Sequence, residues 1–444
     1  MTNNQRGFLF LFFLFIYSCL NLGFLGVPNK LLVASLGFLV FLISFVNTDF
    51  ALIVLIFSML LSPEFQLGHI PGRAVVLRID DLFIFLVFFG WLAKMAVNKE
   101  LGLLKTNPLN KPILFYIFIC IFSSGIGALR GTNNLKHSIF YLLKYFEYFI
   151  LFFMVSNNLK SRRQAKIFIY FMLLVAFIVC VFALRVSLST GMRATAPFEG
   201  EQGEPNTLAG YLIIIFSLIL GLFIYASSIR EKLFLILLGT LAVPTFIYTQ
   251  SRAGLAGFLV MYLVFIFVSK RQKVALILSL LLISILVILV FPQEVFYRYK
   301  SAFMGNRRVE VLGKKIGIDE SGQARIESMK GSLRVWAKYP ILGWGVPGRG
   351  AVSDVQYTRV LREVGILGFL VFLYLIASLF KVAKVNLNNP SLDNFSCGLN
   401  TAFFSSLAGL LVMGVGAEVF IIIRIMEPFW FLVAIVVSLP ELKQ

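Results

Sequence analysis

The chain has 444 residues, of which 59% are hydrophobic and 14% are charged, and its formal net charge is +19. Because a soluble domain carries charge at about a quarter of its positions, this composition excludes an ordinary soluble domain. A chain this apolar offers no soluble surface of the size of a duplex, so we expect no nucleic acid partner. The basic balance indicates the lipid bilayer, with anionic lipid and diphosphate headgroups, as the partner.

Apolar runs long enough to cross a bilayer as a helix, about 20 residues, recur from end to end of the chain. They predict an all-α polytopic membrane protein with about 12 to 14 transmembrane helices. The first run follows MTNNQR and is interpreted as a retained helix, because no small-residue cleavage site follows it. The candidate spans are residues 8–27, 31–46, 50–61, 82–98, 112–129, 138–156, 165–186, 207–226, 232–249, 252–269, 274–292, 359–380, 396–416 and 419–438.

Lysine and arginine side chains gather in alternate short connections between these spans, which sets the expected orientation. Under the positive-inside rule these connections face the cytoplasm, and both termini then lie inside the cytoplasmic membrane. We expect one integral domain in three parts: an earlier helical bundle (1–292), a large outer loop (293–358) and the last helices (359–444). The basic connections contain Lys94 to Lys111, Lys160 to Lys166, Arg230 and Lys232, Lys270 to Lys273, and Lys381 and Lys384.

The outer loop is itself basic. From Arg298 to Arg359 the chain holds twelve Lys or Arg residues against five Asp or Glu. A loop of about 65 residues lies at the limit beyond which the charge rule stops governing orientation, so topology does not explain its charge. Two interpretations remain open: a solvated loop near lipid headgroups, or a surface that binds an anionic ligand.

Cysteine and histidine usage gives no sign of a metal centre. Cys19, Cys120, Cys180 and Cys397 all fall in or beside apolar segments and none has CxxC spacing. The chain has only two histidines, which argues against a metal site built on imidazole. We therefore expect no metal and no cofactor.

The first outward-facing stretch that could carry chemistry is RATAPFEGEQGEPNTLAGYL, Arg193 to Leu212. Its Glu-Pro-Asn-Thr segment predicts a turn that leads into a helix, with Asn206 or Thr207 available as the N-cap. A helix N-terminus offers free N–H groups and the positive end of a dipole, which suit an anion. Simple turn and capping chemistry is the alternative.

The second stretch is YTQSRAGLAGFLV, Tyr248 to Val260. Arg252 stands at the outer mouth of a span, where it could bind a ligand or reach lipid headgroups. The small residues that follow it predict close helix packing. They are Ala253, Gly254, Ala256 and Gly257.

The third stretch runs from Ala324 to Leu370. Its amphipathic first part carries Arg325, Arg334 and Trp336, and a glycine-rich turn after Pro340 returns the chain to the membrane. Asp354 stands where the next helix is expected to begin, so it is a candidate site residue or a helix cap. Arg359 and Glu363 have i, i+4 spacing and could pair with each other.

Two spans contain charged residues. Lys144 and Glu147 are three residues apart in one span, and Arg424 and Glu427 have the same spacing in the last. Charged side chains in spans face protein or water and are functional candidates by default. Here the spacing favours mutual neutralisation within each pair.

Five motifs, in this order along the chain, resemble those of the O-antigen ligase and O-antigen polymerase superfamily of bacterial surface-polysaccharide assembly. The resemblance covers residues 80–380 approximately. The motifs are RIDDLFIFL; GEPNTLAGYL; QSRAGLAGF; PILGWG, which follows Arg325 and Trp336; and EVGILG, which follows Tyr357.

The resemblance implies a metal-independent integral-membrane glycosyltransferase of GT-C-like architecture. Such enzymes take a glycan from undecaprenyl diphosphate at the outer face of the membrane. It implies that Arg193, Arg252 and Arg325 contact diphosphate or sugar. The further expected substrate-binding residues, in the same stretches, are Asn206, Arg334, Arg359 and Glu363. Chain-length regulator and flippase proteins are the expected protein partners.

One position departs from the ligases of this family. Where they carry a histidine, nine residues before Glu363, this chain has Asp354. A carboxylate can serve as a general base, so we expect Asp354, Arg252 and Arg325 to be the catalytic residues. The departure favours a polymerase of repeat units over a ligase that transfers the glycan to lipid A core. A flippase that moves the same lipid-linked unit is the non-enzyme alternative.

Overall fold

The computed structural model describes most of the chain, and it confirms the predicted all-α polytopic membrane fold. Eight of the described helices are long and apolar enough to cross a membrane, and four shorter apolar helices accompany them. The predicted first span, 8–27, lies outside the described residues. The described residues are 30–70, 73–100, 104–199, 203–226, 228–290, 307–311, 314–347 and 354–442.

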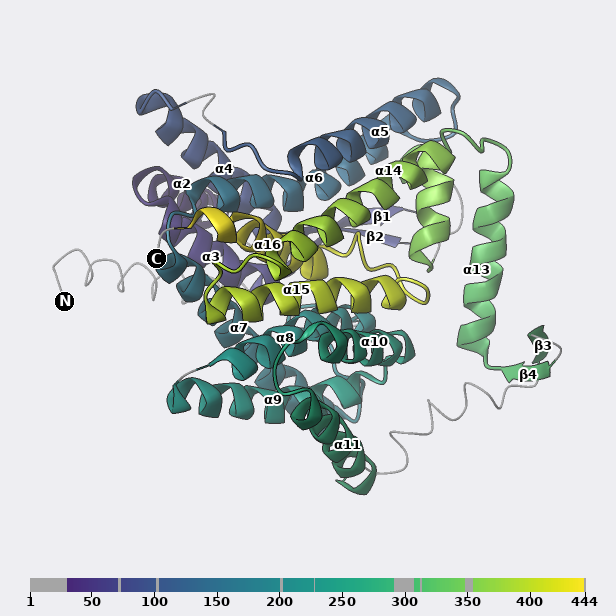
Figure 1. Ribbon diagram of the computed structural model, residues 1–444. Helices are drawn as coiled ribbons and strands as arrows, with labels where there is room; N and C mark the ends of the chain where they lie inside the picture. The colour runs from purple at the N-terminus through teal and green to yellow at the C-terminus, as the bar shows by residue number, and fades with distance from the viewer. Residues whose placement is uncertain are drawn as a thin grey trace.

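Most helices lie side by side in one bundle, and α13 runs across one end of it (Figure 1). The earlier helices are α2 (Lys30–Val46), α3 (Thr48–Leu61), α4 (Ile79–Val97), α5 (Asn110–Leu129), α6 (Leu135–Asn158), α7 (Arg162–Thr190), α8 (Pro205–Tyr225), α9 (Ile229–Thr249), α10 (Arg252–Val268) and α11 (Lys273–Val290). The later ones are α13 (Glu320–Trp336), α14 (Gln356–Leu387), α15 (Asn394–Met413) and α16 (Ile423–Ser438), followed by the short 3-10 turn η1 (Leu439–Glu441).

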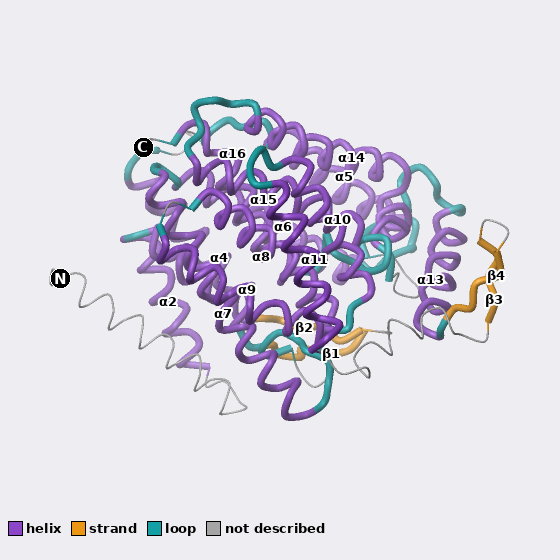
Figure 2. Tube along the Cα trace, turned by 60° about the horizontal axis from the view of Figure 1, so that its bottom comes forward, coloured by secondary structure: helices purple, strands orange, loops and turns teal. Residues whose placement is uncertain are grey.

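Two small antiparallel hairpins, which the sequence analysis did not predict, lie in connections expected to face outward. In the first, β1 (Glu64–Ile70) pairs with β2 (Arg73–Arg78), with Glu64 opposite Arg78. In the second, β3 (Arg307–Val311) pairs with β4 (Lys314–Ile318) and leads directly into α13. Figure 2 shows β3 and β4 beside α13, away from the helical bundle, whereas β1 and β2 lie close to the bundle, where β2 contacts α4.

Connections between helices gather at two opposite ends of the bundle. One of them, called the Arg252 end, comprises α13 and residues 62–64, 130–134, 191–199, 250–251 and 414–422. There Arg424 of α16 donates to the carbonyl oxygen of Pro197, 2.7 Å away. The other, called the Lys270 end, comprises residues 104–109, 159–161, 269–272 and 388–393. There the Lys270 ammonium donates to the carbonyl oxygen of Leu387 at 3.1 Å. The basic short connections thus share one end, as the sequence predicts.

Glycines allow α10 and α15 to touch through their backbones. A Cβ atom at Gly257 would lie 2.7 Å from the carbonyl oxygen of Gly409, and a Cβ at Gly409 would lie 2.7 Å from that of Gly257. Real Cβ atoms do not come this close to backbone oxygen, so both positions need glycine. The predicted close packing after Arg252 is therefore confirmed, and it fixes α10 against the centre of the bundle.

We expect Gly257→Ala to destabilise the protein by about 1–3 kcal/mol, because the added methyl group forces α10 away from α15. The measurement is the thermal unfolding midpoint of the full chain in detergent. Gly125→Ala is the matched control, since Gly125 also lies in a membrane helix and a Cβ there meets nothing within 4 Å. Equal midpoints for the two variants would contradict the packing account.

Candidate functional site

The N-termini of α8 and α10 meet at the Arg252 end through one hydrogen bond. Ser251 is the N-cap of α10, and its hydroxyl accepts the N–H of Gly254 at 3.0 Å. The same hydroxyl donates to Oδ1 of Asn206 at 2.7 Å. Two sequence motifs that are 45 residues apart are thereby joined. Two adjacent helix N-termini, with Arg252 as the first residue of one, create a region of positive potential that suits an anion.

The predicted capping role of Asn206 or Thr207 is wrong. The N-cap of α8 is Glu204, and Pro205 occupies the first helical position. Proline is favoured there because its fixed φ suits the helix and the first turn needs no N–H from it. Asn206 therefore falls inside the helix, and its side chain holds Ser251 instead.

Arg252 pairs with Asp319, a residue that no sequence motif indicated, and Arg325 lies near enough for its charge to act on the same carboxylate. Arg252 Nη2 lies 2.9 Å from Asp319 Oδ2. Asp319 is also the N-cap of α13, and its Oδ1 accepts the N–H of Gly322 at 2.9 Å. Burial raises the pKa of Asp319, but the hydrogen bonds from Arg252 and Gly322 and the charges of Arg252 and Arg325 outweigh it, so the pKa falls below its ordinary value. Asp319 is thus a carboxylate paired with Arg252, and the charge of Arg325 also acts on it.

Arg193 lies next to the same site and binds backbone carbonyl oxygens at the end of α9. Its Nε donates to the carbonyl oxygen of Thr249 at 2.9 Å, and its Nη2 donates to that of Gln250 at 3.4 Å. These carbonyls end α9, where a cation is favourable. Gln250 has a positive φ of 49° in the turn before Ser251, so Arg193 stabilises the turn that presents Arg252.

Asp354 lies beside α13 and does not cap α14. The N-cap of α14 is Val355, which makes no side-chain capping hydrogen bond, so the capping interpretation of Asp354 is wrong. Asp354 is exposed, and its backbone N–H donates to the hydroxyl of Ser328 at 3.1 Å. Ser328 lies one helical turn beyond Arg325, so α13 approaches both Arg252 and Asp354. Arg334 is exposed farther along the same helix.

Arg359 and Glu363 lie in a buried network rather than at the surface. Arg359 Nε lies 2.7 Å from Glu363 Oε1, and its Nη1 lies 2.6 Å from Glu418 Oε2. The hydroxyl of Tyr145 donates to the other oxygen of Glu363 at 2.8 Å. The predicted i, i+4 pairing is confirmed. The network ties the start of α14 to α6 and to the connection 414–422, so these side chains hold the site's framework.

The last two motifs fold against each other. Gly365 has a φ of 66° and kinks α14, which leaves backbone groups free inside the helix. The N–H of Trp344 donates to the carbonyl oxygen of Arg362 at 2.9 Å, and the N–H of Gly345 donates to that of Glu363 at 2.8 Å. The glycine-rich turn therefore satisfies the kink and holds the C-terminal end of the outer loop on the bundle.

The charges within spans do not pair as predicted. Lys144 pairs with Asp81 at the start of α4 instead of Glu147, because α4 packs against α6 and brings that carboxylate closer. Arg424 pairs with Glu64 at 3.0 Å instead of Glu427, and it also donates to the carbonyl oxygens of Leu60 in α3 and of Pro197. Both cations join distant segments, so their partners could not be read from i, i+3 spacing.

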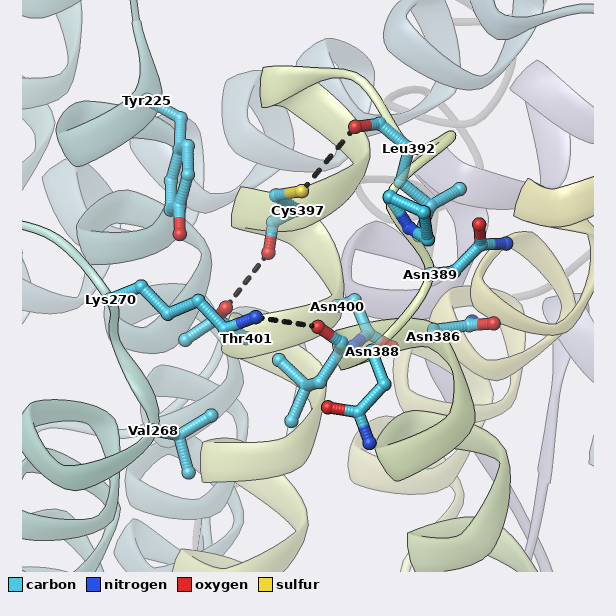
Figure 3. A pocket seen from close by; sticks show the side chains of 12 residues that line it. Tyr225, Val268, Lys270, Asn386, Asn388, Asn389, Leu392, Cys397, Asn400 and Thr401 are labelled. Atoms are coloured by element: carbon cyan, nitrogen blue, oxygen red, sulfur yellow. Dashed lines mark hydrogen bonds between the residues drawn. The ribbon is translucent and has the colours of Figure 1, made fainter.

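A polar cavity of about 220 Å³ lies at the Lys270 end, away from the predicted site residues (Figure 3). Lys270, Thr401 and several asparagines line it, and Tyr225 forms one wall. The Lys270 ammonium bonds the last carbonyl oxygen of α14 there. A cation at a helix C-terminus is stabilising, so this contact is explained by helix capping.

Glu199 is a titratable group close to the Arg252 end. Its Oε2 accepts the N–H of Ala196 at 3.3 Å and that of Glu204 at 3.1 Å. Burial raises its pKa to about 8, and the nearby carboxylates of Glu64 and Glu204 add to this, while Arg424 opposes it. Glu199 therefore keeps its proton to a higher pH than an ordinary glutamate does.

The described chain is thus a helical membrane protein that gathers arginines and two helix N-termini at one end, the features of an anion-binding site. Residues 237–373 match a family model described as O-antigen ligase. The match contains Arg252, Arg325, Asp354 and Glu363, and it confirms the resemblance to the O-antigen ligase and polymerase superfamily. It supports a glycosyltransferase-like enzyme with a ligase or polymerase type of function. No curated protein matches the chain.

We expect Glu199→Gln to increase stability relative to the natural protein, by an amount that grows as pH rises above 4.5. A carboxyl whose pKa is raised on folding binds its proton more tightly in the native state, so stability falls as pH rises from 4.5 to about 8. Glutamine mimics the protonated acid and removes this loss. The variant should unfold at nearly the same temperature as the natural protein at pH 4 and at a higher temperature at pH 9. A constant difference at both pH values would contradict the assignment.

Proposed function

We propose that this protein polymerises oligosaccharide repeat units of a surface polysaccharide, either O-antigen or exopolysaccharide. The donor is a glycan on undecaprenyl diphosphate, and the reaction takes place at the outer face of the cytoplasmic membrane. The observation that carries the proposal is the pairing of Arg252 with a carboxylate on which the charge of Arg325 also acts, beside two helix N-termini. That arrangement fits the negative charge of a diphosphate. The Arg252 end then faces outward, and both termini face the cytoplasm.

The reaction is a glycosyl transfer. A hydroxyl of the acceptor glycan attacks the anomeric carbon of the donor, and the bond from that carbon to the diphosphate oxygen breaks. Arg252 and Arg325 stabilise the negative charge that develops on the leaving diphosphate. Asp354 accepts the proton of the attacking hydroxyl, and its exposed position leaves it accessible to a large glycan.

A ligase that passes the glycan to an acceptor such as lipid A core is the second candidate. Asp354 at the position of the ligase histidine favours the polymerase. The lipid-linked glycans of a deletion strain distinguish the two: single repeat units on the carrier lipid identify a polymerase, and long unattached chains identify a ligase. Flippase activity is contradicted if the accumulated units reach the outer leaflet.

Arg252→Ala and Arg325→Ala should each reproduce the deletion phenotype while the protein still folds and inserts. Each charged contact to a diphosphate contributes about 1.5–3 kcal/mol, which corresponds to about 10- to 150-fold in the reaction rate. Lysine should restore activity only in part, because it lacks the planar fork of arginine. The measurement is polymer length in membranes of the complemented strain.

Lys330→Ala is the matched control for these variants, since Lys330 is an exposed cation on the same helix as Arg325. It should form normal polymer. Normal polymer from both arginine variants would contradict the proposed diphosphate site. Contact with lipid headgroups would then be the role of Arg252.

Asp354→Asn should lower the polymerisation rate about 100-fold or more, the usual contribution of a general base. Asparagine keeps the size of the side chain and the backbone hydrogen bond to Ser328, so the fold is unchanged. Asp354→His should retain part of the activity, since imidazole is also a base. An Asn variant with normal rate would remove Asp354 from the mechanism and leave the arginines.

A further inference from the structure

We propose that Asp319 is an internal competitor for the donor diphosphate: it occupies the arginine site in the ligand-free protein, and the diphosphate displaces it from Arg252. Asp319 would then set the affinity of the enzyme for its donor. The inference rests on the proposed function, because it takes Arg252 and Arg325 as the diphosphate-binding residues.

The ion pair is placed where a solute can reach it. The side chain of Arg252 is 18% exposed and that of Asp319 is 22% exposed. A partly exposed pair contributes little to folding, so breaking it costs little. The fully buried pairs of Arg359 cannot be exchanged in this way, because removing a partner there leaves an uncompensated charge.

A diphosphate is a better partner for this site than Asp319. The carboxylate approaches Arg252 through one nitrogen, Nη2, while its other oxygen is used by the N–H of Gly322. Asp319 therefore offers Arg252 a single oxygen of a singly charged group. A diphosphate carries more negative charge and several oxygens, so it can bind the guanidinium fork in a bidentate manner.

Displacement does not require α13 to unfold. Asp319 can leave Arg252 and still cap α13 through Gly322. The rest of the helix keeps separate attachments: the hydroxyl of Ser328 accepts the N–H of Asp354 at 3.1 Å, and the indole N–H of Trp344 donates to the carbonyl oxygen of Val335 at 2.7 Å. The exchange is therefore local to the first turn of α13.

Asp319→Asn tests the idea, because asparagine caps a helix as well as aspartate but carries no charge. The full chain in detergent is titrated with inorganic pyrophosphate and with a short prenyl diphosphate. The variant should bind both about 5-fold more tightly than the natural protein, the effect of removing a pair worth about 1 kcal/mol. Glu320→Gln is the control: it removes an exposed negative charge from the next residue and should not change affinity.

An Arg252→Ala background separates the possible failures. If Arg252→Ala weakens diphosphate binding and Asp319→Asn then brings no gain, both the diphosphate site and the competition are supported. If Arg252→Ala weakens binding but Asp319→Asn alone leaves affinity unchanged, the competition is overturned and the site remains. If Arg252→Ala leaves binding unchanged, the proposed diphosphate site itself is overturned. Equal gains from Asp319→Asn and Glu320→Gln would reduce the effect to general electrostatics and would also overturn the competition.

Discussion

The hydrogen bonds between the glycine-rich turn and the kink of α14 position the candidate site as a whole. Gly365 interrupts the helix, and the N–H of Ile366 then finds the carbonyl oxygen of Pro340 at 2.8 Å. Inside a membrane protein a free backbone group away from water costs several kcal/mol, so the kink and the turn depend on each other. Because α13 leads directly into this turn, the same bonds determine where α13 crosses the Arg252 end. Arg325 and Asp319 are carried to Arg252 as a consequence.

Buried charged side chains also join the helices and connections around the Arg252 end. Arg359 has a carboxylate on either side, from its own helix and from the connection before α16. Arg424 donates to the carbonyl oxygens of Ser62 and Pro197, which lie in two other connections. Such charges add little net stability compared with apolar residues of the same size, but each becomes costly when one partner is removed. They therefore specify which connections meet at the Arg252 end.

Sequence reasoning predicted the features that depend on local pattern. The apolar runs gave the helices, the small residues after Arg252 gave the close packing of α10, and i, i+4 spacing gave the pair of Arg359 and Glu363. Contacts between residues that are far apart in the chain were not predicted. Asp319 looks like an ordinary helix cap in the sequence, and only the path of α13 brings it to Arg252. The partners of Lys144 and Arg424 were missed for the same reason, since helix packing and not spacing selects them.

Cationic side chains at the two ends of the bundle lie at different helix termini. At the Lys270 end, Lys270 donates to the last carbonyl oxygen of α14, and Lys105 donates to that of Leu159 after α6, at 2.8 Å. These cations lie at helix C-termini, where the dipole favours them and no further anion is needed. Arg252 instead is the first residue of α10, where the helix dipole disfavours a cation. An arginine in that place requires an anionic partner. Asp319 supplies one, but it reaches Arg252 through a single oxygen. A diphosphate carries more negative charge and more oxygens than one carboxylate, so it suits an arginine at a helix N-terminus better.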